Sequence, residues 1–371
     1  MATSIGEMLD TLTVTGDLYE KLEDNALRCF ACGHRCVIRE GRRGICQVRF
    51  NQGGELRVPH GYVAALQSDP VEKKPFFHVL PSVNALTFGM LGCDFHCGYC
   101  QNWLTSQAMR DPSSDVSVNY IRKISPKGML EYARKTKASI VVSSYNEPLI
   151  TSEWAVEIFK VAKANGLMCA YVSNGNNTPE VMEYIRPYIS AYKVDLKCMQ
   201  DKNYRKLGGV LQNTLDGIKR AHDSGLWVEI VTLTIPGFND SNEELWDAAR
   251  FIAGVSRDIP WHVTAFHKDY KMTDPENTDA KTLLRAAEIG KEAGLRFVYA
   301  GNLPGQVGEY EDTFCPTCNE RLIRRHGYII REYHVTGEGT CPNCNQQIPG
   351  LWHKDPSQVV LNGLGMPLPV Y

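Results

Sequence analysis

Strand-like and helix-like segments alternate between residues 80 and 302, and this alternation constrains the fold more than any other feature of the sequence. Short apolar runs rich in β-branched and aromatic residues predict strands at 83–89, 139–145, 168–173, 191–196, 227–235, 261–266 and 296–301. Apolar residues three and four apart predict helices at 127–137, 152–166, 214–225, 242–254 and 281–294. The alternation favours parallel β/α units, arranged either as an α/β barrel or as an open doubly wound sheet.

Polar groups follow six consecutive strand-like runs, at the position where α/β folds place their functional side chains. In chain order they are Cys93, Cys97 and Cys100; Tyr145, Asn146 and Glu147; Asn174; Asp195 and Lys197; Asn239 and Asp240; and His267 and Lys268. Each group has a structural alternative, such as a turn, a helix cap by Glu147 or a surface ion pair between Asp195 and Lys197. Their shared position at one rim favours a functional site.

The composition is that of a globular protein without a marked charge. Of the 371 residues, 43% are hydrophobic and 22% are charged, and the formal net charge is −2. This balance gives no overall attraction to nucleic acid or to an anionic membrane. Neither an export segment nor a run of about 18 apolar residues occurs, which predicts a cytoplasmic protein without a membrane partner. The arginines at 42, 43, 321, 324 and 325 are typical of solvated faces, with binding of a nucleic acid or an acidic partner as the alternative.

The thirteen cysteines indicate metal binding, because most of them form groups with metal-ligand spacing. The groups are Cys29, Cys32, Cys36 and Cys46; Cys93, Cys97 and Cys100; and Cys315, Cys318, Cys341 and Cys344. Cys169 and Cys198 stand alone beside apolar runs and are expected to be buried small hydrophobic residues.

The spacing of the middle group, C-x3-C-x2-C, provides three thiolates where a closed structural site needs four. Zinc is one explanation. A 4Fe-4S cluster is the other, and three thiolates would leave one of its irons open to a small molecule. With Tyr99 before the last cysteine, the motif resembles the signature of the radical S-adenosylmethionine enzymes. This resemblance implies a partial (β/α)6 barrel in which the methionyl group of S-adenosylmethionine is the missing ligand and Tyr99 lies by the adenine.

Further site residues are implied by the same resemblance. Tyr145, Asn146 and Glu147 occupy the place of the family's Gly-Gly-Glu segment, which holds the methionyl ammonium, but both glycines are replaced. Asn174, Asp195 and Lys197 resemble segments of glycyl-radical activating enzymes that contact the ribose or the carboxylate. The family's reaction begins with an electron from the cluster, so a reductant such as ferredoxin or flavodoxin is an implied partner.

Six segments resemble the radical enzyme of the AmmeMemoRadiSam group, which is similar to pyruvate formate-lyase activating enzymes in its barrel. They are DPVEKKPFFH (69–78), GCDFHCGYCQNWLTSQ (92–107), YNEP (145–148), PWHVTAFHKDYKM (260–272), VYAGNLPG (298–305) and TFCPTCNERLIRRHGY (313–328). The group occurs with AMMECR-type and Memo-type proteins, which are therefore possible partners. The expected organisation is a Cys-rich module at 1–78, the barrel at 79–305 and a zinc-ribbon or rubredoxin-like module at 306–371.

The two terminal cysteine groups are expected to bind metal. Two C-P-x-C pairs separated by 22 residues predict a closed site for zinc or rubredoxin-like iron at the C-terminal end. Asn319 and Asn345 follow these pairs where glycine is usual, and asparagine tolerates the left-handed conformation. For the N-terminal group, zinc is the first interpretation and an auxiliary iron-sulfur cluster the second.

Two classes of function remain from the sequence. The leading hypothesis is an enzyme that cleaves S-adenosylmethionine reductively and removes hydrogen from an unidentified substrate, with activation of a glycyl-radical protein as the alternative within it. The rival is a non-catalytic zinc-ribbon protein that recruits a partner. The rival leaves the polar strand ends unexplained.

Overall fold

A central eight-stranded sheet organises the computed structural model, which describes residues 5–370. Its spatial order is β16-β15-β14-β13-β12-β11-β9-β8. The strands are β8 (Ala65–Pro70), β9 (Asn84–Gly89), β11 (Ala138–Ser143), β12 (Met168–Ser173), β13 (Ala191–Asp195), β14 (Trp227–Thr234), β15 (Trp261–Ala265) and β16 (Val298–Gly301). From β9 to β16 all neighbours are parallel, and β8 pairs antiparallel with β9. The predicted α/β barrel architecture is confirmed.

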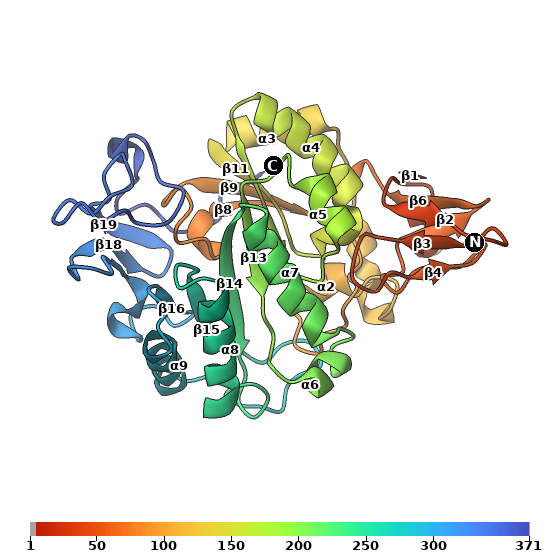
Figure 1. Ribbon diagram of the computed structural model, residues 1–371. Coiled ribbons are helices and arrows are strands. Elements are labelled where there is room, and N and C mark those ends of the chain that lie inside the picture. The colour runs from red at the N-terminus through yellow and green to blue at the C-terminus, as the bar shows by residue number, and fades with distance from the viewer. Residues whose placement is uncertain (1–4, 371) are drawn as a thin grey trace.

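Helices connect the parallel strands and cover the outer face of the sheet (Figure 1). They are α3 (Pro126–Lys135), α4 (Ser152–Ala164), α5 (Pro179–Ile185), α6 (Asp201–Lys206), α7 (Leu211–Asp223), α8 (Asn242–Val255) and α9 (Ala280–Glu292). Side chains of Ser125, Thr178, Ser241 and Asp279 cap α3, α5, α8 and α9 by accepting hydrogen bonds from first-turn amides. Helices α5 and α6 were not predicted, because six or seven residues are too few for a recognisable periodicity.

The N-terminal region forms two small antiparallel sheets beside α2 and α5 (Figure 1). One sheet contains β1 (Thr13–Thr15), β6 (Glu55–Pro59) and β5 (Phe50–Gln52), and the other contains β2 (Tyr19–Lys21), β3 (Leu27–Cys29) and β4 (Val37–Ile38). Helix α1 (Ile5–Asp10) precedes them, and α2 (Trp103–Ser106) follows the middle cysteine group. A two-stranded sheet joins β7 (Tyr62–Val63) to β10 (Arg122–Lys123). The first four residues of the expected N-terminal module, and residue 371, lie outside the described residues.

The C-terminal region lies at the opposite end of the barrel, beside β16 (Figure 1). Its sheet contains β17 (Thr313–Phe314), β18 (Arg321–His326) and β19 (Ile329–Tyr333). The described chain also contains short 3₁₀ helices at Val71–Lys73, Pro112–Tyr120, Pro148–Thr151, Gly308–Glu311 and Pro356–Gln358. Within residues 5–370, no helix has both the length and the apolar character needed to cross a membrane.

A buried polar network fastens the C-terminal region to the barrel. Glu229 of β14 accepts hydrogen bonds from the amides of Phe77 and His78 at 3.0 and 2.9 Å and from Nε1 of Trp227 at 3.0 Å, and its Oε2 lies 2.6 Å from Nε2 of His262. The guanidinium of Arg325 donates to the carbonyl of Phe77 at 2.9 Å and lies 4.3 Å from the centre of that ring. Because these charged groups are buried, their fixed partners hold the two regions in one arrangement.

Candidate functional site

A cavity of about 610 Å³ opens where the parallel strands end. Its volume falls in the range of about 300–1,000 Å³ that small-molecule sites occupy. The predicted residues among those that line it are Cys97, Tyr99, Cys100, Tyr145, Asp195, Lys197 and His267. Lining residues that were not predicted as site residues include Glu72, Lys73, Lys74, Lys193, His262 and Tyr328. Side chains from several strand ends therefore line the same cavity as Tyr328, which lies in the C-terminal hairpin formed by β18 and β19.

The cysteines of the loop after β9 lie in apolar surroundings. Buried members of this cluster, besides Cys97 and Tyr99, are Phe95, Cys198, Tyr204, Leu207, Ile235 and Phe266. Burial raises the pKa of Cys97 to about 12 and outweighs the opposing charge of Lys197. A thiol in such a place stays protonated unless a metal cation replaces the proton. The amide of Phe95 donates to Sγ of Cys93 at 3.4 Å, and Oγ of Ser106 lies 3.1 Å from Sγ of Cys100.

A buried carboxylate inside this loop, Asp94, connects it to the end of β12. Oδ1 of Asp94 accepts a hydrogen bond from Nδ2 of Asn174 at 2.7 Å, and Oδ2 accepts one from Nδ2 of Asn176 at 2.8 Å. Nε2 of His34 lies 4.0 Å from Oδ2. Asp94 was not predicted as a site residue. Its position between Cys93 and Cys97 was the feature of the sequence that could have indicated a role in the site.

Glu147 and Asn174, both expected to contact the cofactor, hydrogen-bond to each other. Oε2 of Glu147 accepts from the amide of Asn174 at 2.8 Å, and Oε1 accepts from Ser173 Oγ at 2.7 Å and from the amide of Leu149 at 3.1 Å. Glu147 thereby caps the helix Pro148–Thr151, the structural alternative considered from the sequence. Burial, and then the charge of Asp94, raises the pKa of Glu147 to about 8. Neither Glu147 nor Asn174 is among the described residues that line the cavity.

The two residues before Glu147 differ in their orientation. Oδ1 of Asn146 accepts from the amide of Met90 at 3.0 Å, so this side chain holds the start of the cysteine loop. Tyr145 lines the cavity, and its φ of 69° lies in the left-handed region that favours glycine. Its hydroxyl lies 3.1 Å from Oδ2 of Asp69 and 3.4 Å from Nζ of Lys74. Tyrosine thus adopts a backbone conformation suited to the glycine that the family resemblance implied here.

Charged side chains of β13 form another wall of the cavity. Asp195 pairs with Lys193 and, at 3.5 Å, with Lys197. Burial alone would raise the pKa of Asp195, but the two ammonium groups outweigh it and hold the pKa below its usual value. The carboxylate is therefore ionised and flanked by two cations, an arrangement suited to holding polar groups of a bound molecule.

The comparisons with known proteins agree with this geometry. Residues 88–252 match the family described as the Radical SAM superfamily. A protein of Methanocaldococcus jannaschii, named Uncharacterized protein MJ0808, is 34% identical over 333 residues, which cover 89% of this chain and 97% of that protein. The chain therefore contains a radical SAM domain.

Other proteins are similar to shorter parts of the chain. The pyruvate formate-lyase-activating enzyme of Staphylococcus epidermidis is 27% identical over 192 residues, which cover 48% of this chain and 74% of that enzyme. The crystal structure of a radical SAM methyltransferase from Sphaerobacter thermophilus aligns with a TM-score of 0.45 and 14% identity, covering 60% of this chain and 67% of that one. The superfamily's homologues are enzymes, which favours the enzymatic hypothesis over the zinc-ribbon alternative.

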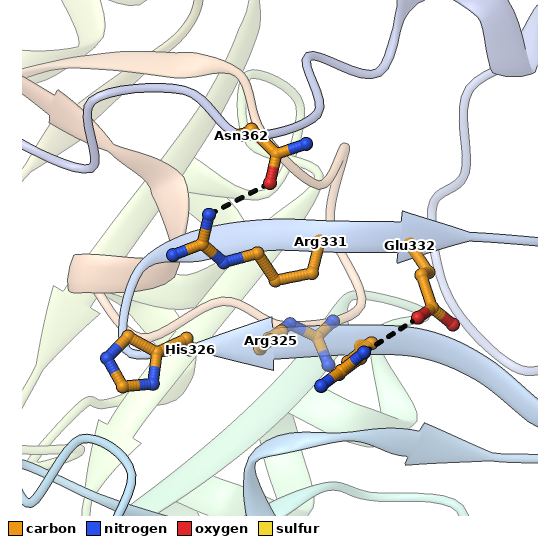
Figure 2. Close-up of a pocket in the computed structure, with 6 residues that line it drawn as sticks. Arg325, His326, Arg331, Glu332 and Asn362 are labelled. Carbon is orange, nitrogen blue, oxygen red and sulfur yellow. Dashed lines mark hydrogen bonds and ion pairs between the residues drawn. The ribbon is translucent and has the colours of Figure 1, made fainter.

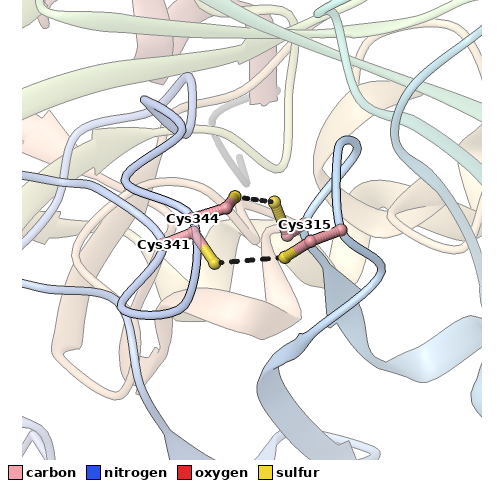
Figure 3. Close-up of side chains that lie close together, drawn as sticks. Cys315, Cys341 and Cys344 are labelled. Carbon is pink, nitrogen blue, oxygen red and sulfur yellow. Dashed lines mark hydrogen bonds between the residues drawn. The ribbon is translucent and has the colours of Figure 1, made fainter.

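Outside the radical SAM domain, the four C-terminal thiols converge on one point (Figure 3). The sulfurs of Cys315 and Cys344 lie 3.5 Å apart and those of Cys318 and Cys341 lie 3.6 Å apart, and all four lie within 4.8 Å of one another. A tetrahedral ion with metal-sulfur bonds of about 2.3 Å separates its sulfurs by about 3.8 Å. Asn319 and Asn345 have φ values of 59° and 58°, so the predicted left-handed conformations are confirmed.

The N-terminal cysteines are neighbours, but their sulfurs do not converge in the same way. The amide of Cys29 donates to the carbonyl of Cys36 at 3.0 Å. Burial, then Asp94 and the thiols of Cys29, Cys46 and Cys36, raises the pKa of Cys32 well above its usual value. Among residues 5–370, no three ligand atoms of this group lie within 4.8 Å of one another, and the same holds for the radical SAM cysteines.

A second cavity of about 440 Å³ lies on the C-terminal hairpin, lined by Arg324, Arg325, His326, Arg331, Glu332 and Asn362 (Figure 2). Arg324 donates to Glu332 at 3.0 Å, and Arg331 donates to Asn362 at 2.8 Å. Arg325 was expected on a solvated face, but it is 4% exposed and its guanidinium is bound by Phe77 and Thr313. The cationic groups of this cavity are therefore largely engaged within the protein.

Proposed function

We propose that this protein is an enzyme that reductively cleaves S-adenosylmethionine at a 4Fe-4S cluster held by Cys93, Cys97 and Cys100. The observation that carries the proposal is that two of these cysteines, together with Tyr99, Asp195 and Lys197, line one cavity at the strand ends. When bound, the cluster would supply the electron that cleaves S-adenosylmethionine into methionine and a 5'-deoxyadenosyl radical, and this radical would remove hydrogen from a substrate.

The donor set of the loop suits a cluster of several irons. Three thiols are available, one fewer than a closed single-ion site needs, and the surrounding side chains are apolar. Cys97, Tyr99 and Phe266 are each at most 7% exposed. This packing excludes water from the place where a reactive radical must be protected.

The other predicted residues divide into two roles. Tyr99, Asp195 and Lys197 face the cavity and would contact the adenine, the ribose or the carboxylate of S-adenosylmethionine. Asn146, Glu147 and Asn174 bind backbone groups and side chains of the loops, so we assign them to positioning the site. Three donors already bind the Glu147 carboxylate, two at Oε1 and one at Oε2, so a direct bond to the methionyl ammonium would use the remaining acceptor site on Oε2.

The substrate that this cavity fits is a polar small molecule. Lys74 and Tyr145 form a corner of the cavity, and Tyr328 of the C-terminal hairpin adds to the wall. Burial lowers the pKa of Lys74 to about 8, although Asp69 opposes the shift, so this amine exchanges its proton near neutral pH. A second candidate function, installing a glycyl radical on a protein, is favoured by the similarity to the S. epidermidis activating enzyme.

The remaining assignments are part of the same proposal. An electron carrier such as ferredoxin or flavodoxin would supply the reducing equivalent. The C-terminal thiols would hold zinc or a rubredoxin-like iron. Membership of the AmmeMemoRadiSam group, with AMMECR-type and Memo-type partners, stays a prediction from the sequence motifs.

Formation of 5'-deoxyadenosine tests the proposed function. Anaerobically reconstituted protein is given S-adenosylmethionine and a strong reductant, with Cys97→Ala and Cys169→Ala as matched variants. We expect product from the parent and from Cys169→Ala, and none from Cys97→Ala. Product formation by Cys97→Ala at the parent's rate contradicts the proposal, as does the absence of product from a parent with a verified four-iron cluster.

A further inference from the structure

We propose that Cys29, Cys32, Cys36 and Cys46 hold an iron-sulfur cluster that passes single electrons from an acidic carrier protein to the radical SAM cluster. The inference rests on the proposed function, because the acceptor is the cluster assigned there to the loop after β9. Three features carry it: the separation of the four thiols, the contacts between the two cysteine loops, and the surface around Cys36.

The separation of the N-terminal thiols distinguishes this site from the C-terminal one. In the C-terminal site all four sulfurs lie within 4.8 Å of one another, as a single tetrahedral ion requires. Both groups contain four cysteines, yet within residues 5–370 no three N-terminal sulfurs meet this limit. The radical SAM cysteines do not meet it either. Four thiols can also hold an iron-sulfur cluster, whose framework of several irons does not require the sulfurs to meet at one ion.

The two cysteine loops are in direct contact. The guanidinium of Arg110 donates to the carbonyl of Phe95, between Cys93 and Cys97, at 2.7 Å and also to the carbonyl of Ile45, directly before Cys46. A Cβ on Gly92 would lie only 3.1 Å from the carbonyl oxygen of Cys46 and 2.8 Å from Val48. A side chain at position 92 would not fit between the loops, so clusters held by them would be close neighbours.

A second set of contacts joins the loops on the side of Asp94. The amide of Gly33, next to Cys32, donates to the carbonyl of Asn176 at 2.8 Å, and a Cβ on Gly33 would lie 2.2 Å from Oδ1 of that residue. Asn176 in turn donates to Asp94 at 2.8 Å. Nε2 of His34 is shielded from solvent and has no hydrogen-bond partner among the described residues. These contacts fix Cys32 relative to Cys93 and Cys97.

The surface around Cys36 has the character of a docking site for an acidic redox protein. Cys36 is partly exposed, and its sulfur accepts from the amide of Ile45 at 3.4 Å. Val37 and Ile45 are 57% and 41% exposed, which places apolar side chains next to this thiol. Arg39 and Arg42 are exposed on the same loop, and the carboxylate of Glu40 between them accepts hydrogen bonds from the amides of Gly53 and Gly54. Apolar side chains beside cationic groups complement the surface of a negatively charged partner. This attraction is local, because the net charge of the whole chain is −2.

The transfer is balanced by one-electron steps. The reduced carrier, a flavin or iron-sulfur protein, loses one electron, and the N-terminal cluster gains it. The N-terminal cluster is then reoxidised as the radical SAM cluster is reduced. No bond forms between the carrier and this chain, and no proton is transferred with the electron.

Metal analysis of the full chain tests the assignment. Iron, sulfide and zinc are measured after anaerobic reconstitution, and the electron paramagnetic resonance spectrum of the reduced protein is recorded. Two multiple variants are compared with the parent: the double variant Cys36→Ala/Cys46→Ala and the triple variant Cys93→Ala/Cys97→Ala/Cys100→Ala. The control is Cys169→Ala. We expect each multiple variant to lose about half of the parent's cluster iron and sulfide and a different spectral component, with zinc unchanged. Loss of zinc from Cys36→Ala/Cys46→Ala, or loss of no metal, overturns the inference.

Donor dependence tests the relay with the thiols intact. The rate of 5'-deoxyadenosine formation with reduced flavodoxin is divided by the rate with titanium(III) citrate. For Arg39→Glu/Arg42→Glu we expect this ratio to fall about tenfold at low ionic strength. An unchanged ratio overturns the relay. Zinc in the N-terminal site of a parent that cleaves S-adenosylmethionine overturns this inference alone, whereas a parent with both clusters and no cleavage overturns the proposed function as well.

Discussion

The carboxylate of Asp94 accepts a hydrogen bond from the side-chain amide of Asn174 at 2.7 Å. Asp94 belongs to the cysteine loop after β9, and Asn174 follows β12, two positions away in the sheet. Asp94 also accepts from Asn176 and lies near His34 of the N-terminal region. One buried carboxylate therefore sets the position of the cysteine loop relative to the barrel and to the N-terminal cysteines.

We expect Asp94→Asn to lower both iron content and stability. The new amide presents a donor to one of the two donating asparagines, and losing a buried hydrogen bond costs about 1–3 kcal/mol. Elemental analysis and denaturant unfolding measure the two effects. Asp115→Asn, at an exposed position, is the matched control. Parent-like iron content and unfolding midpoint for Asp94→Asn contradict the positioning role.

Glu72 predicts a specific dependence of stability on pH. Burial raises its pKa from 4.5 to about 7, and Oε2 has no hydrogen-bond partner among the described residues while Oε1 accepts from the amide of Ser82 at 2.7 Å. The folded protein thus retains a proton between these pH values that the unfolded chain has released. Glu72 therefore makes its full contribution to the free energy of unfolding below pH 4.5, and this contribution is lost as pH rises through about 7.

Glu72→Gln removes this pH dependence, since the amide keeps the acceptor for Ser82 and places a neutral group at the unpartnered position. We expect the variant to be more stable than the parent at pH 8 by about 1–3 kcal/mol and no more stable near pH 4. Urea unfolding across this pH range measures the difference, with the exposed Glu131→Gln as control. A difference that is constant with pH contradicts the assignment.

The fold was predictable because its strands are buried on both faces. Continuous apolar runs identified β9 and β11 to β16, and helical periodicity identified the five longer crossover helices. Strand β8 was missed because ALQSDP is antiparallel at the edge of the sheet and carries charged and polar residues. Its residue Asp69 nevertheless binds Lys74 and the hydroxyl of Tyr145, the two residues that form a corner of the cavity.

The site was predictable only in part. Spacing pointed to the cysteines, of which Cys97 and Cys100 line the cavity, and strand ends pointed to Tyr145, Asp195 and Lys197, which line it as well. The orientation of Glu147 and Asn174 depends on hydrogen bonds between loops that are distant in sequence, so no local pattern could reveal it. The difference between the N-terminal and C-terminal thiol groups is also a tertiary property, since both contain four cysteines at plausible ligand spacings.

The left-handed conformation of Asn319 gives a prediction for the C-terminal site. Its φ is 59°, and its amide donates to the carbonyl of Cys315 at 3.0 Å. A β-branched residue is strained in this region, whereas glycine is not. We expect Asn319→Val to lower the free energy of unfolding by about 1–2 kcal/mol and Asn319→Gly to leave it nearly unchanged or higher. Thermal unfolding of both variants measures this difference. Equal stability of Asn319→Val and Asn319→Gly contradicts the role assigned to the left-handed backbone.

The last prediction concerns the metal held by the C-terminal thiols. Cys341 is buried, and its sulfur lies 3.6 Å from that of Cys318, so Cys341→Ala leaves three ligands of a four-ligand site. We expect loss of one metal ion per chain and a lower melting temperature, because a structural ion contributes directly to folding. The hairpin that carries Tyr328 then holds the cavity wall less firmly, which should raise the substrate KM more than it lowers kcat. Elemental analysis, calorimetry and steady-state kinetics measure these effects against Cys169→Ala, and retention of the ion in Cys341→Ala contradicts the four-thiolate site.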